Sequence, residues 1–299
     1  MNKILTAKHI TITIFKGILV SIIGLVGASA GGIITSILGL PGVNLPESVD
    51  LQRIFLQNFF TGIFIAVLIG EMFKKLKIGF LARFIFIFIF YYLNNHFLLA
   101  IEASVFTNIM NLSFGAVFGI FPSLLIALGI SLFWPSSRLD KAILARFSEY
   151  FKRKKPGTFI LRFIGAWLIF IVIYYLMGMI VSPIVVPYYQ NPDNNLGLVL
   201  PPQSTIVKVQ LLRGFLYLLS VLPIFILWNA GKKSLFLWLS SIFIYQNIAM
   251  GMLFTVWLPA KLRIAHSIEL TLDSILLALF YVVLLYIPAN RVKESKNDD

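Results

Sequence analysis

Residues 158–182, TFILRFIGAWLIFIVIYYLMGMIVS, form an apolar run that contains one charged residue, Arg162. A helix needs about 20 mostly apolar residues to cross the hydrocarbon core of a bilayer, and this run is long enough to do so. The residues directly before it, 152–155, read KRKK. Lys and Arg gather on the cytoplasmic side of membrane proteins. The run therefore predicts a transmembrane helix that begins at the cytoplasmic face.

Seven further runs have the same length and character. The eight candidate spans are 14–38, 54–73, 79–101, 112–134, 158–182, 209–228, 234–256 and 265–288. Apolar residues make up 59% of the chain, charged residues 12%, and the mean hydropathy is +0.91. Soluble domains are about 45–50% apolar and about 25% charged. We therefore predict an all-α, polytopic membrane helix bundle.

The positive charge alternates along the chain. Of the 25 Lys and Arg residues, 19 fall in five segments expected to be cytoplasmic. These are the N-terminus, 74–83, 135–157, 229–233 and 289–299. This bias places both termini in the cytoplasm and the protein in the cell membrane. It also explains the net charge of +13 without a nucleic-acid partner. The absence of Cys excludes disulfides and thiolate metal sites.

A basic linker divides the chain into two sets of four spans, 1–134 and 158–299, with the linker at 135–157. Both sets begin in the cytoplasm, so they predict a parallel internal repeat; the alternative is that short membrane hairpins look alike. Apolar and basic residues within 138–155 follow near helical spacing. This pattern predicts an amphipathic helix that contacts anionic lipid headgroups, with docking of a soluble partner as the alternative.

Small residues recur every four positions in the first span, at Gly27, Gly31, Thr35 and Gly39. Such a stripe lets two helices approach closely. We expect it to pack inside the bundle; a dimer seam or a site of helix motion is the alternative.

Ionisable residues are rare within the spans, and such residues are costly in hydrocarbon. The last span opens with His266, Glu269 and Asp273, which project from one face of a helix. Three interpretations remain open for this group: a proton or cation site, a divalent metal site, and ion pairing with Arg53, Arg213 or Arg263. No cofactor is predicted, and the metal is the weakest of the three because no spacing matches a known zinc signature.

Other polar residues complete the candidate site. Asn95 and Glu102 share a face of the third span, and Gln246 and Asn247 lie near the centre of the seventh. We expect Glu102 to converge with His266 on an outward-facing polar cavity. The long outer segment 183–207 contains five prolines, and we expect it to be either a cover for that cavity or an extended connector.

No nucleotide-binding, serine hydrolase, metalloprotease or potassium-filter motif occurs in the chain. A transporter or permease with an outward-facing polar site is the favoured function, so an enzyme is the less favoured class. The alternatives are a membrane-embedded enzyme acting on a lipid or lipid-linked substrate and a non-catalytic assembly subunit.

Four stretches of the chain resemble those of an uncharacterised family of multi-pass bacterial membrane proteins. They are YYLNNHFLLAIEASVFT (91–107), VSPIVVPYY (181–189), VQLLRGFLYLLSVLP (209–223) and RIAHSIELTLDSILLALF (263–280). The resemblance implies a membrane location and no activity.

Overall fold

The structure, a computed structural model, describes residues 2–44, 49–136, 143–191, 196–252 and 255–288. The helices are α1 (Asn2–Ile37), α2 (Leu51–Lys74), α3 (Phe80–Tyr91), α4 (Leu98–Phe106), α5 (Leu112–Phe133), α6 (Ile143–Lys152), α7 (Pro156–Gln190), α8 (Gln203–Leu227), α9 (Lys232–Ile244) and α10 (Ala260–Leu285), with π-helical segments η1 (Tyr92–Phe97) and η3 (Tyr245–Met252). Eight helical spans are long and apolar enough to cross a membrane. The predicted all-α, polytopic membrane bundle is confirmed.

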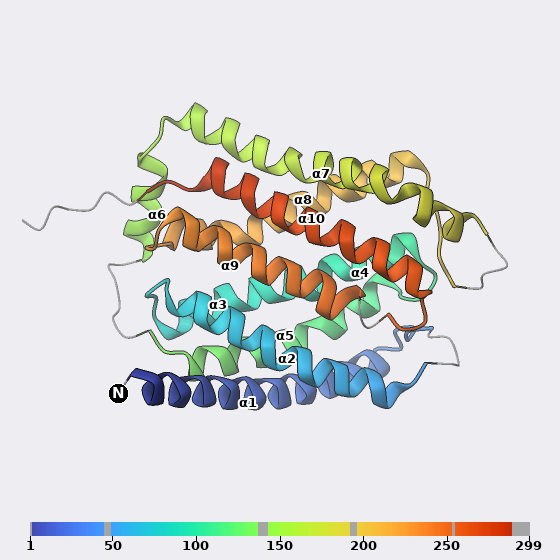
Figure 1. Cartoon of the computed structure of the whole chain (residues 1–299), viewed down its shortest axis with the longest axis horizontal. Helices are drawn as coiled ribbons and strands as arrows, with labels where there is room; N and C mark the ends of the chain where they lie inside the picture. The colour runs from blue at the N-terminus through green and yellow to red at the C-terminus, as the bar shows by residue number, and fades with distance from the viewer. Residues whose placement is uncertain (1, 45–48, 137–142, 192–195, 253–254, 289–299) are drawn as a thin grey trace, which may run out of the picture.

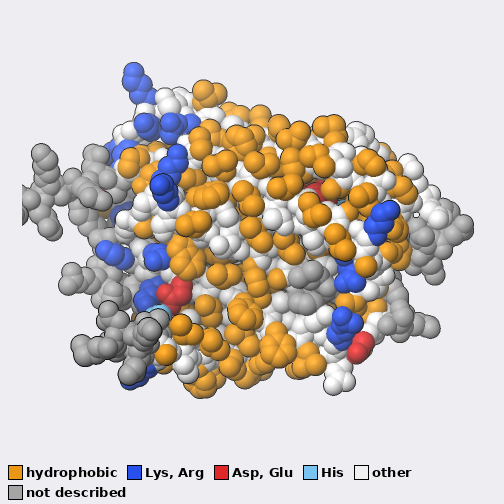
Figure 2. All heavy atoms as spheres, viewed as in Figure 1, with side chains coloured by type: hydrophobic (Ala, Val, Ile, Leu, Met, Phe, Trp, Pro, Cys, Tyr) orange, Lys and Arg blue, Asp and Glu red, His pale blue; other side chains and the backbone are white. Residues whose placement is uncertain are grey.

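The spans lie side by side and give the molecule two charged ends. Figure 2 shows hydrophobic side chains over the middle of the molecule and Lys and Arg side chains toward both ends. We call the end that carries α6 and the start of α9 the basic end, and the other the opposite end. The band of apolar side chains between them is the surface that a bilayer would cover.

The two sets of four spans share one packing pattern. In the first set, α1 packs against α2 and α5, and α3 packs against α5. In the second set, α7 packs against α8 and α10, and α9 packs against α10. Across the centre, α2 contacts α9 and η3, while α8 contacts α3, η1 and α4. Figure 1 shows α1 and α7, the equivalent first helices, on opposite edges of the bundle.

A hydrogen bond between the first and second helices occurs in both halves, and its donors, Ser21 and Trp167, lie 146 residues apart. Ser21 of α1 donates a hydrogen bond to the Phe59 carbonyl of α2 (2.6 Å), and Trp167 of α7 donates one to the Leu211 carbonyl of α8 (2.7 Å). Leu211 follows Phe59 by 152 residues. The π-helical segments begin at Tyr92 and Tyr245, 153 residues apart. The predicted parallel repeat thus has matching features in both halves.

Helix α6 closes the basic end by joining the two halves. Arg146 donates to the carbonyl oxygens of Leu76, just after α2, and Leu227, the last residue of α8. The hydroxyl of Tyr150 donates to the Leu285 carbonyl at the end of α10 (2.7 Å). Burial raises the pKa of the Tyr150 phenol, so it remains a hydrogen-bond donor. Helix termini leave such carbonyls without a partner in their own helix, and α6 supplies the donors.

Only part of the small-residue stripe of α1 packs against another helix. Gly27 and Gly31 lie against α5, where an added Cβ would meet Pro122 Cα at 2.6 Å and the Phe118 carbonyl oxygen at 2.7 Å, respectively. The Thr35 hydroxyl bonds back to its own helix. The prediction was wrong for Gly39: an added Cβ there would meet nothing within 4 Å, and its φ is +63°. Gly39 follows the end of α1 in a left-handed conformation that glycine adopts readily.

Two predicted boundaries were also wrong, and both matter for the site. Helix α7 continues through Pro183 and Pro187 to Gln190, so the first part of the expected outer loop is helical. Helix α8 begins at Gln203, six residues before the predicted span. Arg213 therefore lies about 15 Å along the helix and not at its boundary.

Candidate functional site

The centre of the site is an ion pair between the two halves. Arg213 of α8 donates to Glu102 of α4 at 2.7 Å and to Gln210 of its own helix at 3.1 Å. Its guanidinium also lies over the ring of Phe170 from α7, 5.8 Å from the centroid. Arg213 is buried, 8% exposed. The Nε of Arg213 and the Nε2 of Gln210 are buried without a hydrogen-bond partner in the structure.

Helix α10 supplies the second charged group. His266 Nδ1 and Glu269 Oε2 lie 2.7 Å apart, three residues apart on one helix face. Glu269 is only 7% exposed. An added Cβ at Gly178 of α7 would lie 3.7 Å from Glu269 Oε1, so α7 passes close to this carboxylate. The spacing of these residues in the sequence is sufficient to predict the pair.

Asp273 connects the two groups. It interacts electrostatically with Glu269, Arg213 and Glu102, and its Oδ1 is buried without a hydrogen-bond partner in the structure. Asp273 is the fourteenth of the 26 residues of α10, which places it near the middle of that span. The predicted span 265–288 put Asp273 nearer the outer end; α10 begins earlier, at Ala260, and this moves Asp273 to the middle of the helix.

Three carboxylates and one arginine thus share an electrostatic network at the interface of the halves. Two tyrosines of α7, Tyr174 and Tyr189, interact electrostatically with Glu102 and Glu269. The charge of Arg213 does not balance three ionised carboxylates. The group, which we call the carboxylate cluster (Glu102, Arg213, His266, Glu269 and Asp273), is therefore suited to bind protons or other cations.

The structure does not support the metal interpretation. Within the described residues, no group of three or more His, Asp or Glu side chains is arranged to hold a metal ion. His266, Glu269 and Asp273 are all described.

A layer of uncharged polar residues lies beside the carboxylate cluster. Asn247 donates to Ser274 at 3.0 Å and accepts from the Tyr217 hydroxyl at 3.3 Å. Tyr217 also interacts electrostatically with Arg213, Glu102 and Asp273. Asn95 donates to the Met250 sulfur at 3.5 Å, which links η1 to η3. The two segments that carry these amides, η1 and η3, therefore contact each other at the interface of the halves.

Gln246 is the exception within this layer. It is 5% exposed, and neither its Nε2 nor its Oε1 has a hydrogen-bond partner in the structure. Buried amides without partners cost about 1–3 kcal/mol.

The sequence predicts some of the contacts among these residues and not others. Glu102 pairs with Arg213, and His266 with Glu269, whereas a meeting of Glu102 with His266 was expected. Gln210, Arg213 and Tyr217 share a face of α8, a spacing visible in the sequence once Arg213 is placed within the span. Two hollows of the described chain lie along α2, away from the carboxylate cluster.

Comparisons with family models, curated proteins and solved structures gave no match to this chain. The function must therefore be argued from the carboxylate cluster itself.

Proposed function

We propose that the protein is a membrane transporter whose carboxylate cluster carries protons or another cation. The observation that carries this proposal is Asp273, a carboxylate near the middle of a spanning helix with one buried oxygen that lacks a partner. An ionised carboxylate in this setting is costly unless a proton or a cation neutralises it. Binding and release of that proton or cation is the elementary step of cation-coupled transport.

The spacing on α10 provides a route to Asp273. His266, Glu269 and Asp273 follow one another along one helix face over about 10 Å of rise. His266 lies toward the opposite end of the molecule, and Asp273 lies near mid-depth. A proton accepted by the imidazole can pass to Glu269, which is in hydrogen-bond contact at 2.7 Å, and then to Asp273. Arg213 would retain the charge of Glu102 and prevent that carboxylate from competing for the proton.

The proposal includes an orientation and a location. The basic end would face the cytoplasm, as the excess of Lys and Arg there favours, and the membrane would be the cell membrane. The carboxylate cluster would then receive its cation from outside. Movement of the two halves against each other would expose it to the inside.

A flux assay tests the mechanism. Protein reconstituted into liposomes with an internal pH-sensitive dye should take up protons when a pH gradient or a membrane potential is applied. Glu269→Gln and Asp273→Asn should each reduce the uptake at least tenfold, because each removes a proton-binding oxygen from the route. Glu149→Gln, on the exposed side of α6, is the matched control and should leave it unchanged.

Two outcomes would count against the proposal. Normal uptake in both carboxylate variants would remove the route along α10. If the unaltered protein moved neither protons nor Na⁺ or K⁺, cation transport itself would be wrong.

A further inference from the structure

Two adjoining hollows follow α2 near the opposite end of the molecule. The first has a volume of about 380 Å³ and is lined by Asp50, Gln52, Arg53, Leu56, Gln57 and Phe60. The second, of about 440 Å³, lies between α1 and α2 and is lined mainly by Ile22, Leu25, Val26, Phe55 and Phe59. Leu56 lines both, so the hollows adjoin at this side chain. We call the first the polar hollow and the second the apolar hollow.

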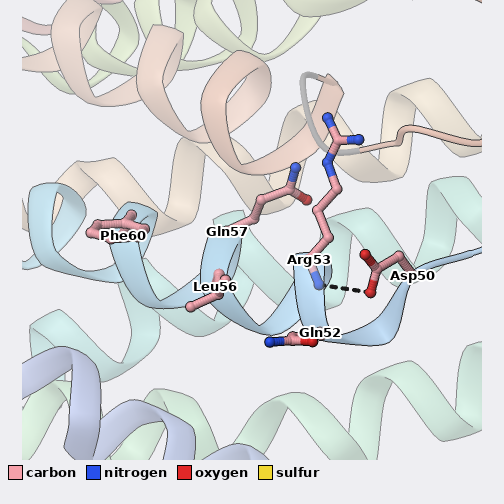
Figure 3. Close-up of a pocket in the computed structure, with 6 residues that line it drawn as sticks. All are labelled: Asp50, Gln52, Arg53, Leu56, Gln57 and Phe60. Atoms are coloured by element: carbon pink, nitrogen blue, oxygen red, sulfur yellow. Dashed lines mark hydrogen bonds between the residues drawn. The ribbon is translucent and has the colours of Figure 1, made fainter.

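The polar hollow presents a cation. Figure 3 shows Arg53 and Gln57 extending from one face of α2, with the Asp50 carboxylate turned to the first turn of the helix. The Oδ1 of Asp50 accepts from the backbone N–H of Arg53 at 3.1 Å, as an N-cap residue does. Among the described residues the Arg53 guanidinium has no ion-pair partner. An anion is the ligand that this guanidinium favours.

Gln57 adds a second requirement. Its Oε1 is buried and has no hydrogen-bond donor in the structure. A ligand that satisfies both side chains therefore carries an anionic group for Arg53 and, close to it, a hydroxyl or ammonium donor for Gln57. The headgroups of phosphatidylglycerol and phosphatidylethanolamine have both groups, whereas phosphatidylcholine has no donor.

The apolar hollow identifies the source of the anion as lipid. Phe55 and Val26, which line it, are more than half exposed, on spans that a bilayer would surround. Arg53 is the third residue of α2, so it lies where lipid headgroups meet the end of a spanning helix. A soluble anion would gain nothing from the apolar hollow, but an acyl chain would cover it.

We propose that these hollows bind one phospholipid whose headgroup carries a hydrogen-bond donor beside the phosphate. Arg53 holds the phosphate, Gln57 accepts from the headgroup hydroxyl or ammonium, and an acyl chain lies in the apolar hollow between α1 and α2. This site is separate from the carboxylate cluster and does not depend on transport activity.

Native mass spectrometry and thermal melting of the full chain in detergent test this site. The probes are phosphatidylglycerol, phosphatidylcholine with the same acyl chains, and inorganic phosphate. Phosphatidylglycerol should stay bound and raise the melting temperature, and phosphatidylcholine should bind more weakly. Arg53→Gln should weaken phosphatidylglycerol binding by about tenfold, since a charge-assisted hydrogen bond is lost.

Two further variants separate the site from general effects of charge and lipid. Lys208→Gln removes an exposed cation from α8 at the same end and should leave binding unchanged. Leu56→Trp should fill the junction of the hollows and abolish binding. Equal binding of both lipids to the unaltered protein and to Arg53→Gln would overturn the proposal. Stabilisation by inorganic phosphate equal to that by phosphatidylglycerol would show an anion site without lipid and would also overturn it.

Discussion

At the residue scale, the two members of the ion pair between Arg213 and Glu102 differ in how deeply they are buried. Arg213 is 10% exposed by its side chain, whereas the Glu102 side chain is 39% exposed. A buried charge that loses its partner remains desolvated, while an exposed one can be solvated or neutralised. The two members of this ion pair should therefore not be equivalent when each is removed.

We expect Arg213→Gln to lower the free energy of unfolding by about 2–3 kcal/mol, and Glu102→Gln by about 1 kcal/mol. The arginine variant leaves Glu102, Glu269 and Asp273 near one another without a cation. Unfolding in mixed detergent micelles measures both values, and Lys208→Gln serves as the exposed control. An equal loss in both variants would mean that Glu102 is more buried in the membrane than its exposure indicates.

The residue scale also shows which part of the site the sequence could reveal. His266 and Glu269 are three residues apart on one helix, so spacing alone predicts their contact. Glu102 and Arg213 are 111 residues apart, and their pairing depends on α4 meeting α8. The sequence placed Arg213 at a boundary because the ten residues before it in α8 include polar side chains, which a hydropathy window excludes.

At the element scale, close packing of α1 on α5 depends on glycine at Gly27. A Cβ there would lie 2.6 Å from Pro122 Cα and 2.9 Å from the Phe121 carbonyl oxygen. Both are backbone atoms, so they cannot move aside as the end of a flexible side chain can. At Gly32, five residues further along the same helix, an added Cβ would meet no atom within 4 Å.

Gly27→Ala should therefore destabilise the protein by about 1–3 kcal/mol through overpacking. Gly32→Ala should have no destabilising effect, since alanine favours a helix over glycine. Thermal melting of the two variants in the same detergent makes the comparison. If both melted at the temperature of the unaltered protein, the contact between α1 and α5 would be looser than the structure shows.

The number of spanning helices could be predicted from the sequence, but the details of their backbone could not. Eight spans were expected from length and hydropathy, and eight are confirmed. The π-helical segments η1 and η3 were not expected, because a π turn changes the backbone without changing hydropathy. At η1, His96 packs directly against Gly119 of α5, where an added Cβ would collide with the His96 Cβ. Such a contact between two spans cannot be predicted from the sequence of either segment alone.

At the scale of the whole molecule, the paired contacts support a duplicated four-span unit, which stays a prediction. The carboxylate cluster is not duplicated with it. Gly62 and Gly214 lie 152 residues apart and each contacts the first helix of its own half. By that register Arg213 corresponds to Thr61, which bonds to its own helix. Arg213 therefore has no charged counterpart at the equivalent position of the first half.

The packing also predicts that the two halves assemble without a covalent link. Helix α6 packs on α7 and α8, so it belongs with the second half, and a break between residues 136 and 137 leaves each four-span unit intact. Fragments 1–136 and 137–299, expressed together, should form a complex, because α2 meets α9 and α8 meets α3. Purification through a tag on the first fragment measures how much of the second is recovered.

Arg146 provides the sharper version of this test, because it donates to the Leu76 carbonyl of the first half and the Leu227 carbonyl of the second. Arg146→Ala should reduce recovery of the second fragment severalfold, since hydrogen bonds from a charged donor contribute about 1.5–3 kcal/mol. Lys152→Ala, which changes an exposed residue of the same helix, should leave recovery of the second fragment unchanged. Unchanged recovery in Arg146→Ala would show that the central helices alone hold the halves together and that α6 only covers the basic end.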